Sequence, residues 1–233
     1  MKKALILPIL ASGCIEYQPE SSLPPAGVPN PRDLEVITQE DKLVQVQVPE
    51  VDILWVVDNS CSMFEEQTGI AQNNPVFMDF CLCSGLDYHI GVVSTDMDDN
   101  NHQGKLRGAG GVRWIDEDTA NPSQVFSTMI SMGTSGSPTE KGRDGAYGGL
   151  EVHAVPGGYN EGFEREDAAM HIVVLADEAD FSTGIGLSEF HDYLATKKWD
   201  EDMLTFSSIV TPPGGCPSAV SYTHLTLPTI CSV

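Results

Sequence analysis

Apolar and polar positions along the chain predict a series of strands. Residues 43–48 alternate the two kinds (LVQVQV), which is typical of a strand with one buried face, and Pro49 ends the run. Residues 51–57 and 170–176 are almost continuously apolar, as expected of strands that are covered on both faces. Further strands are predicted over residues 88–94 and 204–210.

Helical patterns fill the segments between these strands. The longest, residues 63–80, is expected to turn Ile70, Phe77 and Phe80 inward. Residues 96–118, rich in Gly and Asp, predict a long loop. Shorter helices are predicted over residues 123–132, 140–153 and 187–198. Strands that alternate with helices predict an α/β fold, a doubly wound and mostly parallel sheet with helices on both faces.

The first residues have the composition of an export signal. Lys2 and Lys3 precede an apolar run (ALILPILA) that is too short to span a bilayer, and Cys14 follows small residues. This arrangement resembles the lipobox of bacterial lipoproteins. We therefore expect residues 1–13 to be a signal peptide and Cys14 to be lipidated, so that the protein is exported and anchored in the bacterial cell envelope, at the outer membrane or cell surface. An ordinary secretory signal with a chance cysteine is the alternative.

Two further segments are expected to lie outside the folded core. Residues 14–42 are polar and rich in proline, which favours an extended, flexible tether. Residues 220–233 begin with a run (VSYTHLTLPT) that resembles one reading frame of a transposon adapter used to prepare DNA sequencing libraries, so we expect this tail to be non-native. The folded domain is predicted to cover residues 43–219 and to be incomplete at its C-terminus.

Charge narrows the possible partners. The 233 residues include 12 Lys and Arg against 34 Asp and Glu, for a formal net charge of -22. Such a chain repels nucleic acid and attracts cations. Residues 177–180 spell a helicase motif (DEAD), but the chain has no Gly-rich loop ending in Lys-Ser or Lys-Thr. We expect no nucleic acid and no nucleotide as partner, and contact with a membrane only through the lipid anchor.

Oxygen-bearing side chains gather just after the predicted strands. Residues 58–62 (DNSCS) stand where one strand ends and the longest helix begins, and Asp96 and Asp177 follow two other strands. Ligands of parallel α/β sheets bind beyond the carboxyl ends of the strands, so these residues are expected at one edge of the sheet. Oxygen donors of this kind suit Mg²⁺ or Mn²⁺.

The D-x-S-x-S pattern of residues 58–62 resembles the metal-ion-dependent adhesion site of von Willebrand factor type A domains. Residues 87–93 (DYHIGVV) and 162–168 (GFEREDA) are similar to a bacterial branch of this family. The resemblance, over roughly residues 44–219, implies the doubly wound fold of that family and one bound Mg²⁺ or Mn²⁺ ion.

The same resemblance implies a ligand set for the ion. The direct ligands would be Ser60, Ser62 and Ser137, while Asp58 and Asp177 would bind mainly through water. Thr139 and Thr134 are alternatives to Ser137, and Asp96 is expected near the ion without binding it.

The function implied by the resemblance is protein binding or adhesion without catalysis. The metal would take a carboxylate from a protein ligand with an exposed acidic residue. Two alternatives stay open. One is a structural envelope protein with an empty site. The other is a metal-dependent hydrolase, for which the sequence offers no recognisable general base or nucleophile.

Four cysteines lie between the lipobox and the tail: Cys61, Cys81, Cys83 and Cys216. Export permits disulfides. Cys61 and Cys216 both follow predicted strands, so we expect them at the same edge of the sheet and predict a Cys61–Cys216 disulfide. Cys81 would lie roughly 27 Å from Cys61 at the other end of a helix, beyond disulfide reach.

Overall fold

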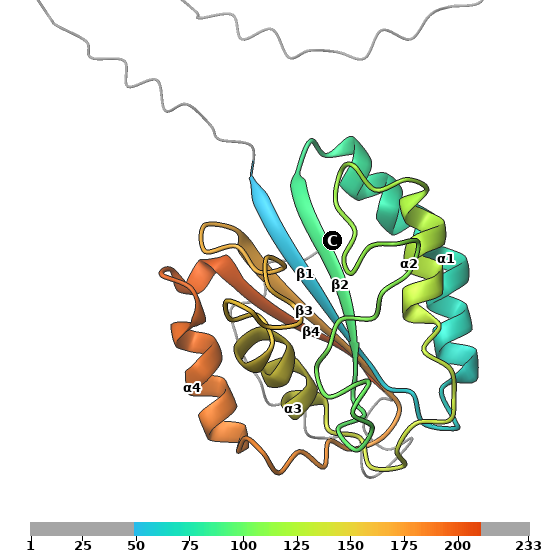
Figure 1. Cartoon of the computed structure of the whole chain (residues 1–233), viewed down its shortest axis with the longest axis vertical. Helices are drawn as coiled ribbons and strands as arrows, with labels where there is room; N and C mark the ends of the chain where they lie inside the picture. Colours follow the sequence, from blue (N-terminus) through green and yellow to red (C-terminus); the bar gives the residue numbers. More distant parts are fainter. Residues whose placement is uncertain (1–48, 211–233) are drawn as a thin grey trace, which may run out of the picture. The chain divides into compact units, whose positions relative to one another are not determined.

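A single parallel sheet organises the domain (Figure 1). The computed structural model describes residues 49–210, and every structural statement below refers to that part of the chain. The sheet has four strands in the order β2-β1-β3-β4, all parallel. They are β1 (Glu50–Val57), β2 (Asp87–Ser94), β3 (Ala169–Ala176) and β4 (Leu204–Val210). The strand predicted over residues 43–48 lies outside the described residues.

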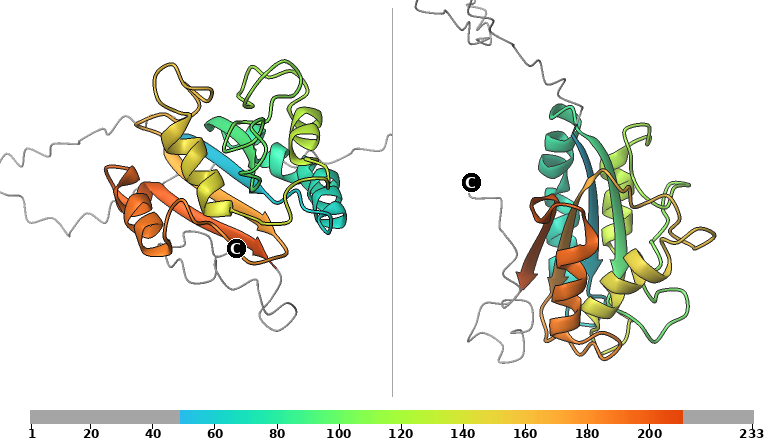
Figure 2. Two further views of the ribbon diagram at one scale, coloured as in Figure 1. Left: turned by 60° about the horizontal axis from the view of Figure 1, so that its bottom comes forward. Right: turned by 90° about the vertical axis from the view of Figure 1, so that its left-hand side faces the viewer.

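Helices cover both faces of this sheet, as Figures 1 and 2 show. The helices are α1 (Phe64–Cys83), α2 (Pro122–Ile130), α3 (Gly142–Tyr147), which continues into the π-helical turn η1 (Gly148–Val152), and α4 (Leu187–Lys197). A short 3-10 turn, η2 (Glu201–Met203), precedes β4. Helices α1 and α2 pack on one face, and α3 and α4 on the other. The predicted doubly wound α/β fold is therefore confirmed. No helix within residues 49–210 is long and apolar enough to cross a membrane.

The side chains of alternate residues in the central strands point into two separate apolar layers, one on each face of the sheet. This explains why β1 and β3 are apolar throughout. Ile53, Trp55 and Val57 of β1 face α1 and α2, whereas Leu54 and Val56 face α3 and α4. Such two-sided burial is expected of a central parallel strand. The side chains of both layers are almost fully enclosed, so the sheet is a rigid base for the loops at its ends.

Two details of the predicted helices are wrong. Ile70 and Phe77 pack against the core, but Phe80 is 66% exposed, because α1 turns this position toward solvent. The helix predicted over residues 140–153 begins only at Gly142. Glu140 therefore lies in the preceding loop, where its side chain is buried.

Residues 87–93 and 162–168 meet at the amino ends of the strands. Arg165 binds the buried Asp52 through its Nε at 2.8 Å, and Asp87 through Nη1 at 2.6 Å. The Nδ1 atom of His89 lies 2.7 Å from the carbonyl oxygen of Phe163. Gly91 is required here because a Cβ atom would lie 2.5 Å from Leu106 and 2.7 Å from Phe163. These two stretches thus stabilise the packing of the loop before β3 on β1 and β2.

We expect Arg165→Met to lower the free energy of unfolding by about 3 kcal/mol, because Asp52 would be left buried without its cation. Asp52 is fully enclosed, and burial raises its pKa against the effect of Arg165. Denaturant unfolding measures the loss. Adding Asp52→Asn to Arg165→Met removes the unpaired charge and should restore part of the stability. A double variant as unstable as Arg165→Met alone would contradict this assignment.

Candidate metal site

The register of the sheet brings the predicted acidic residues to one edge. Val57 of β1 pairs with Ser94 of β2 and with Leu175 of β3. Asp58 continues this register, since its N–H donates to the carbonyl oxygen of Leu175 at 2.9 Å. The loops that carry Asp58, Asp96 and Asp177 consequently begin next to one another, at the ends of the strand arrows in Figure 1.

The turn at residues 58–62 gathers oxygen atoms. Asp58 is fully buried, and its Oδ1 accepts a hydrogen bond from the N–H of Ser60 at 2.7 Å. Its Oδ2 is buried and has no hydrogen-bond partner among residues 49–210. The hydroxyls of Ser60 and Ser62 approach each other to 3.2 Å, with Ser62 on the exposed side. The turn therefore presents one free carboxylate oxygen and two adjacent hydroxyl oxygens.

Glu140 is a fourth acidic residue at this edge, which the sequence did not indicate. Its side chain is 1% exposed. Neither of its carboxylate oxygens finds a hydrogen-bond partner in the described part of the chain. Buried polar atoms without a partner are rare in folded proteins and commonly mark an absent water or ion.

Burial and mutual repulsion act on these carboxylates together. Burial, and then the charges of Asp177 and Glu178, raise the pKa of Asp58 from 3.8 to about 6. Burial, followed by the charges of Asp58, Glu178 and Asp177, raises the pKa of Glu140 from 4.5 to about 7. Like charges that lie this close disfavour the ionised forms, and a bound cation would remove that penalty.

Ser137, the predicted third ligand, is engaged elsewhere in the structure. Its hydroxyl donates to Asp98 Oδ2 at 2.7 Å and accepts from the N–H of Thr139 at 3.1 Å. The Ser137 hydrogen bond, together with Lys141, lowers the pKa of Asp98. Thr139, one of the alternatives to Ser137, is half-buried.

Asp96 connects two loops of the site. Its Oδ1 accepts hydrogen bonds from the N–H groups of Asp98 at 2.9 Å and Asp99 at 3.1 Å, and its Oδ2 accepts from the N–H of Ser137 at 3.1 Å. Both carboxylate oxygens are therefore used to position backbone. Asp96 and Thr134 also line a cavity of about 250 Å³ beside Asn59.

Gln67, on α1, holds the turn against the loop that follows α2, a contact that no pattern in the sequence indicates. Its side-chain amide donates to the carbonyl oxygens of Asp58 at 2.8 Å and Gly133 at 2.9 Å. Its Oε1 accepts from the N–H of Gly133 at 3.1 Å. These partners are backbone atoms, which carry no sequence signature, so only the folded chain reveals the contact.

Asp144 positions the loop after β3, also through hydrogen bonds from its side chain to backbone atoms. Its carboxylate accepts hydrogen bonds at 3.0–3.1 Å from the backbone N–H groups of Thr183, Gly184 and Ile185. The loop that contains Asp177 is thus tied to the start of α3. Hydrogen bonds within the protein therefore help to position the loops at this edge.

The donors present fit a divalent cation. The unpartnered oxygens of Asp58 and Glu140 and the hydroxyls of Ser60 and Ser62 are hard oxygen donors, which Mg²⁺ and Mn²⁺ prefer. Within residues 49–210 no group of three or more His, Cys, Asp or Glu side chains has a metal-binding arrangement. An ion at this edge would therefore need hydroxyl groups or water as additional ligands.

The predicted cysteine sites lie partly outside the described residues. Cys61 is exposed and free in the structure, as are the buried Cys81 and the exposed Cys83. Cys216, the predicted partner of Cys61, and Cys14, the predicted lipidation site, belong to the parts of the chain that the structure does not describe.

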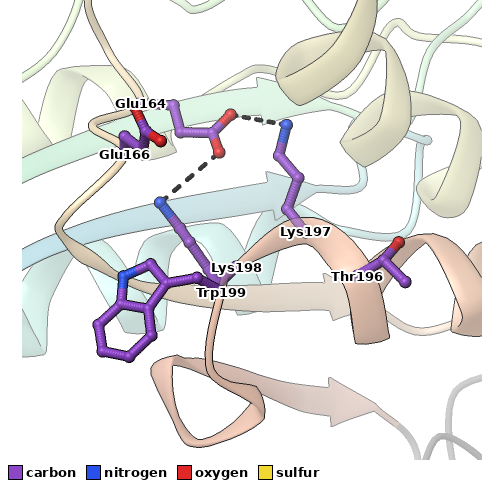
Figure 3. A pocket seen from close by; sticks show the side chains of 6 residues that line it. All are labelled: Glu164, Glu166, Thr196, Lys197, Lys198 and Trp199. Carbon is purple, nitrogen blue, oxygen red and sulfur yellow. Dashed lines mark ion pairs between the residues drawn. The ribbon is translucent and has the colours of Figure 1, made fainter.

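A cavity of about 430 Å³ lies at the opposite edge of the sheet (Figure 3). Lys197 and Lys198 face Glu164 there, with nitrogen–oxygen distances of 2.9 and 3.6 Å. Trp199 beside them is 74% exposed. The lysine charges are balanced within the protein, and the cavity contains none of the predicted site residues.

Comparisons with known proteins bear only on the arrangement of the chain. No family model and no curated protein matches the sequence. The VWA domain of SpRpn10 has a TM-score of 0.41 and 14% identity, over 71% of this chain and 90% of its own. Proximal thread matrix protein 1 from the mussel byssus has a TM-score of 0.39 and 13% identity, over 70% of this chain and 38% of its own. The pilus adhesin SpaC from Lactobacillus rhamnosus GG has a TM-score of 0.35 and 19% identity, over 58% of this chain and 16% of its own. This chain thus spans well under two thirds of the last two proteins. Likenesses of this size say nothing about function.

The raised pKa values predict how stability depends on pH in the absence of metal. The folded chain keeps protons on Asp58 and Glu140 that the unfolded chain releases, so their stabilising effect is complete at about pH 4 and is lost as the pH rises through 6 to 7. We expect the free energy of unfolding in EDTA to fall from pH 5 to pH 8. Denaturant titrations should show a shallower fall for the double variant Asp58→Asn, Glu140→Gln. Equal pH dependence in both proteins would contradict the expectation.

Proposed function

We propose that the chain is a protein-binding module that depends on a divalent metal, Mg²⁺ or Mn²⁺, at the carboxyl edge of its sheet. In this proposal Asp58, Ser60 and Ser62 hold the ion, the loop of residues 134–140 supplies a further oxygen, and Asp177 acts through water. The observation that carries the proposal is the buried Asp58 with an unpartnered Oδ2, in the same turn as two hydroxyls that lie 3.2 Å apart. This arrangement stands on the pattern that resembles the adhesion site of von Willebrand factor type A domains.

The partner in this proposal is a protein with an exposed acidic side chain. A bound ion with an open coordination position can take such a carboxylate as a ligand. The chain itself carries a net charge of -22 and would repel an acidic partner in the absence of the ion. Removal of the metal should therefore abolish capture rather than weaken it, because the long-range field opposes the encounter.

We further propose that the module works on the outside of a bacterial cell. Support comes from the sequence, in which Cys14 follows a short apolar leader and precedes a Pro-rich segment. A lipid at Cys14 would anchor the chain, and residues 14–42 would lift the domain from the membrane surface.

Selection of displayed random peptides on the immobilised chain tests this function. In Mg²⁺ we expect enriched peptides that contain Asp or Glu, that EDTA elutes, and that lose binding when the acidic residue becomes its amide. The Asp58→Ala variant should bind none of them, because it lacks the buried carboxylate that helps to hold the ion. The matched control Glu117→Ala removes an exposed acidic residue outside the site and should bind them like the natural chain. Enrichment that is equal with EDTA, or peptides without an acidic requirement, would contradict the proposal.

A further inference from the structure

Glu140 lies between the loops that follow β2 and β3, and its backbone is fixed on both sides. The N–H of the next residue, Lys141, donates to the carbonyl oxygen of Thr95 at 3.1 Å. The carbonyl oxygen of Glu140 accepts from the N–H of Phe181 at 2.7 Å. These two bonds connect Glu140 to the loops that follow β2 and β3, so they fix the point from which its buried side chain departs.

No cation of the described chain balances this buried carboxylate. Lys141 pairs with Asp98 at 3.0 Å, and Arg143 pairs with Asp180 at 3.0 Å. Both Glu140 oxygens are buried without a hydrogen-bond partner among residues 49–210. An isolated buried carboxylate is costly, and proteins retain one chiefly where it binds a metal or takes part in chemistry. The two backbone bonds place Glu140 at the carboxyl edge of the sheet, and the charges of Asp58, Glu178 and Asp177 act on it there.

We infer that Glu140 is a direct ligand of the divalent ion, in the place that the sequence resemblance assigns to Ser137. This inference rests on the proposed metal site. The hydroxyl of Ser137 is already engaged by Asp98 and by the N–H of Thr139. Glu140 and Asp58 each offer buried, unpartnered oxygen, and one or two carboxylates are the usual number around Mg²⁺.

A second carboxylate changes the charge of the loaded site. Asp58 and Glu140 together balance the two positive charges of the ion, so the chain should retain the metal without help from a partner. Ion binding would then precede partner binding, and the partner's carboxylate would join a site that is already formed.

Calorimetric titration of Mn²⁺ into the full chain, beside thermal unfolding in EDTA, tests this inference. Glu140→Gln should weaken Mn²⁺ binding by more than about tenfold, since even residues that merely support a ligand alter affinity by 10- to 100-fold. The same variant should unfold at a higher temperature in EDTA, because it removes a buried charge without a partner. The controls are Glu178→Gln, which removes a neighbouring charge of the same sign, and Ser137→Ala. Both should change Mn²⁺ affinity much less.

The outcomes separate the inference from the proposed function. If Asp58→Asn abolishes Mn²⁺ binding and Glu140→Gln leaves it unchanged, Glu140 is no ligand and the metal site stands. If Ser137→Ala causes the larger loss, Ser137 is the third ligand and the inference is overturned. If the natural chain binds no Mn²⁺, the metal site and the inference fail together. Glu140→Asp, which keeps the charge but shortens the side chain, should also lose affinity, and it provides a second folded variant.

Discussion

Burial of carboxylates close to other acidic side chains, at one edge of the sheet, governs the chemistry of this domain. The parallel register places the loops after β1, β2 and β3 side by side, and two of the acidic residues there, Asp58 and Glu140, are almost fully buried. A stable fold can keep such residues only if they bind protons, meet cations, or hold a metal. Because Lys141 and Arg143 pair with other carboxylates, the choice within the described chain is between protons and a metal.

Protein contacts position the loops at this edge of the sheet. Gln67 ties the turn after β1 to the loop after α2, Asp96 ties two loops through three backbone N–H groups, and Asp144 holds the loop after β3. At the opposite edge, Arg165 secures β1 and β2 through Asp52 and Asp87. Donors that are already in position lose little conformational freedom when they bind an ion. A cation that binds there would also relieve the repulsion between the carboxylates.

The main elements of the fold could be predicted from the sequence because strands that are buried on two faces are recognisable as continuous apolar runs. The apolar runs of β1 and β3 and the helices between the strands are where the pattern places them, and so is the turn at residues 58–62. Phe80 was expected inside and lies in solvent, since helical spacing alone does not show where a helix stops contacting its neighbours. The resemblance suggested the hydroxyl of Ser137, whereas the structure pairs that hydroxyl with Asp98. The importance of Glu140 was not predictable. A Glu just before a helix is normally an exposed capping residue. Here backbone contacts to the loops after β2 and β3 position it, and these contacts have no sequence signature.

Thermal unfolding of the full chain in Mg²⁺ and in EDTA, beside the Asp58→Ala variant, tests the central claim most directly. A ligand that binds only the folded state adds about 2.7 kcal/mol of stability at a hundred times its dissociation constant. If a metal binds at Asp58, Mg²⁺ should clearly raise the unfolding temperature of the natural chain and leave that of the variant unchanged. No rise in either protein, or an equal rise in both, would contradict a metal site at Asp58.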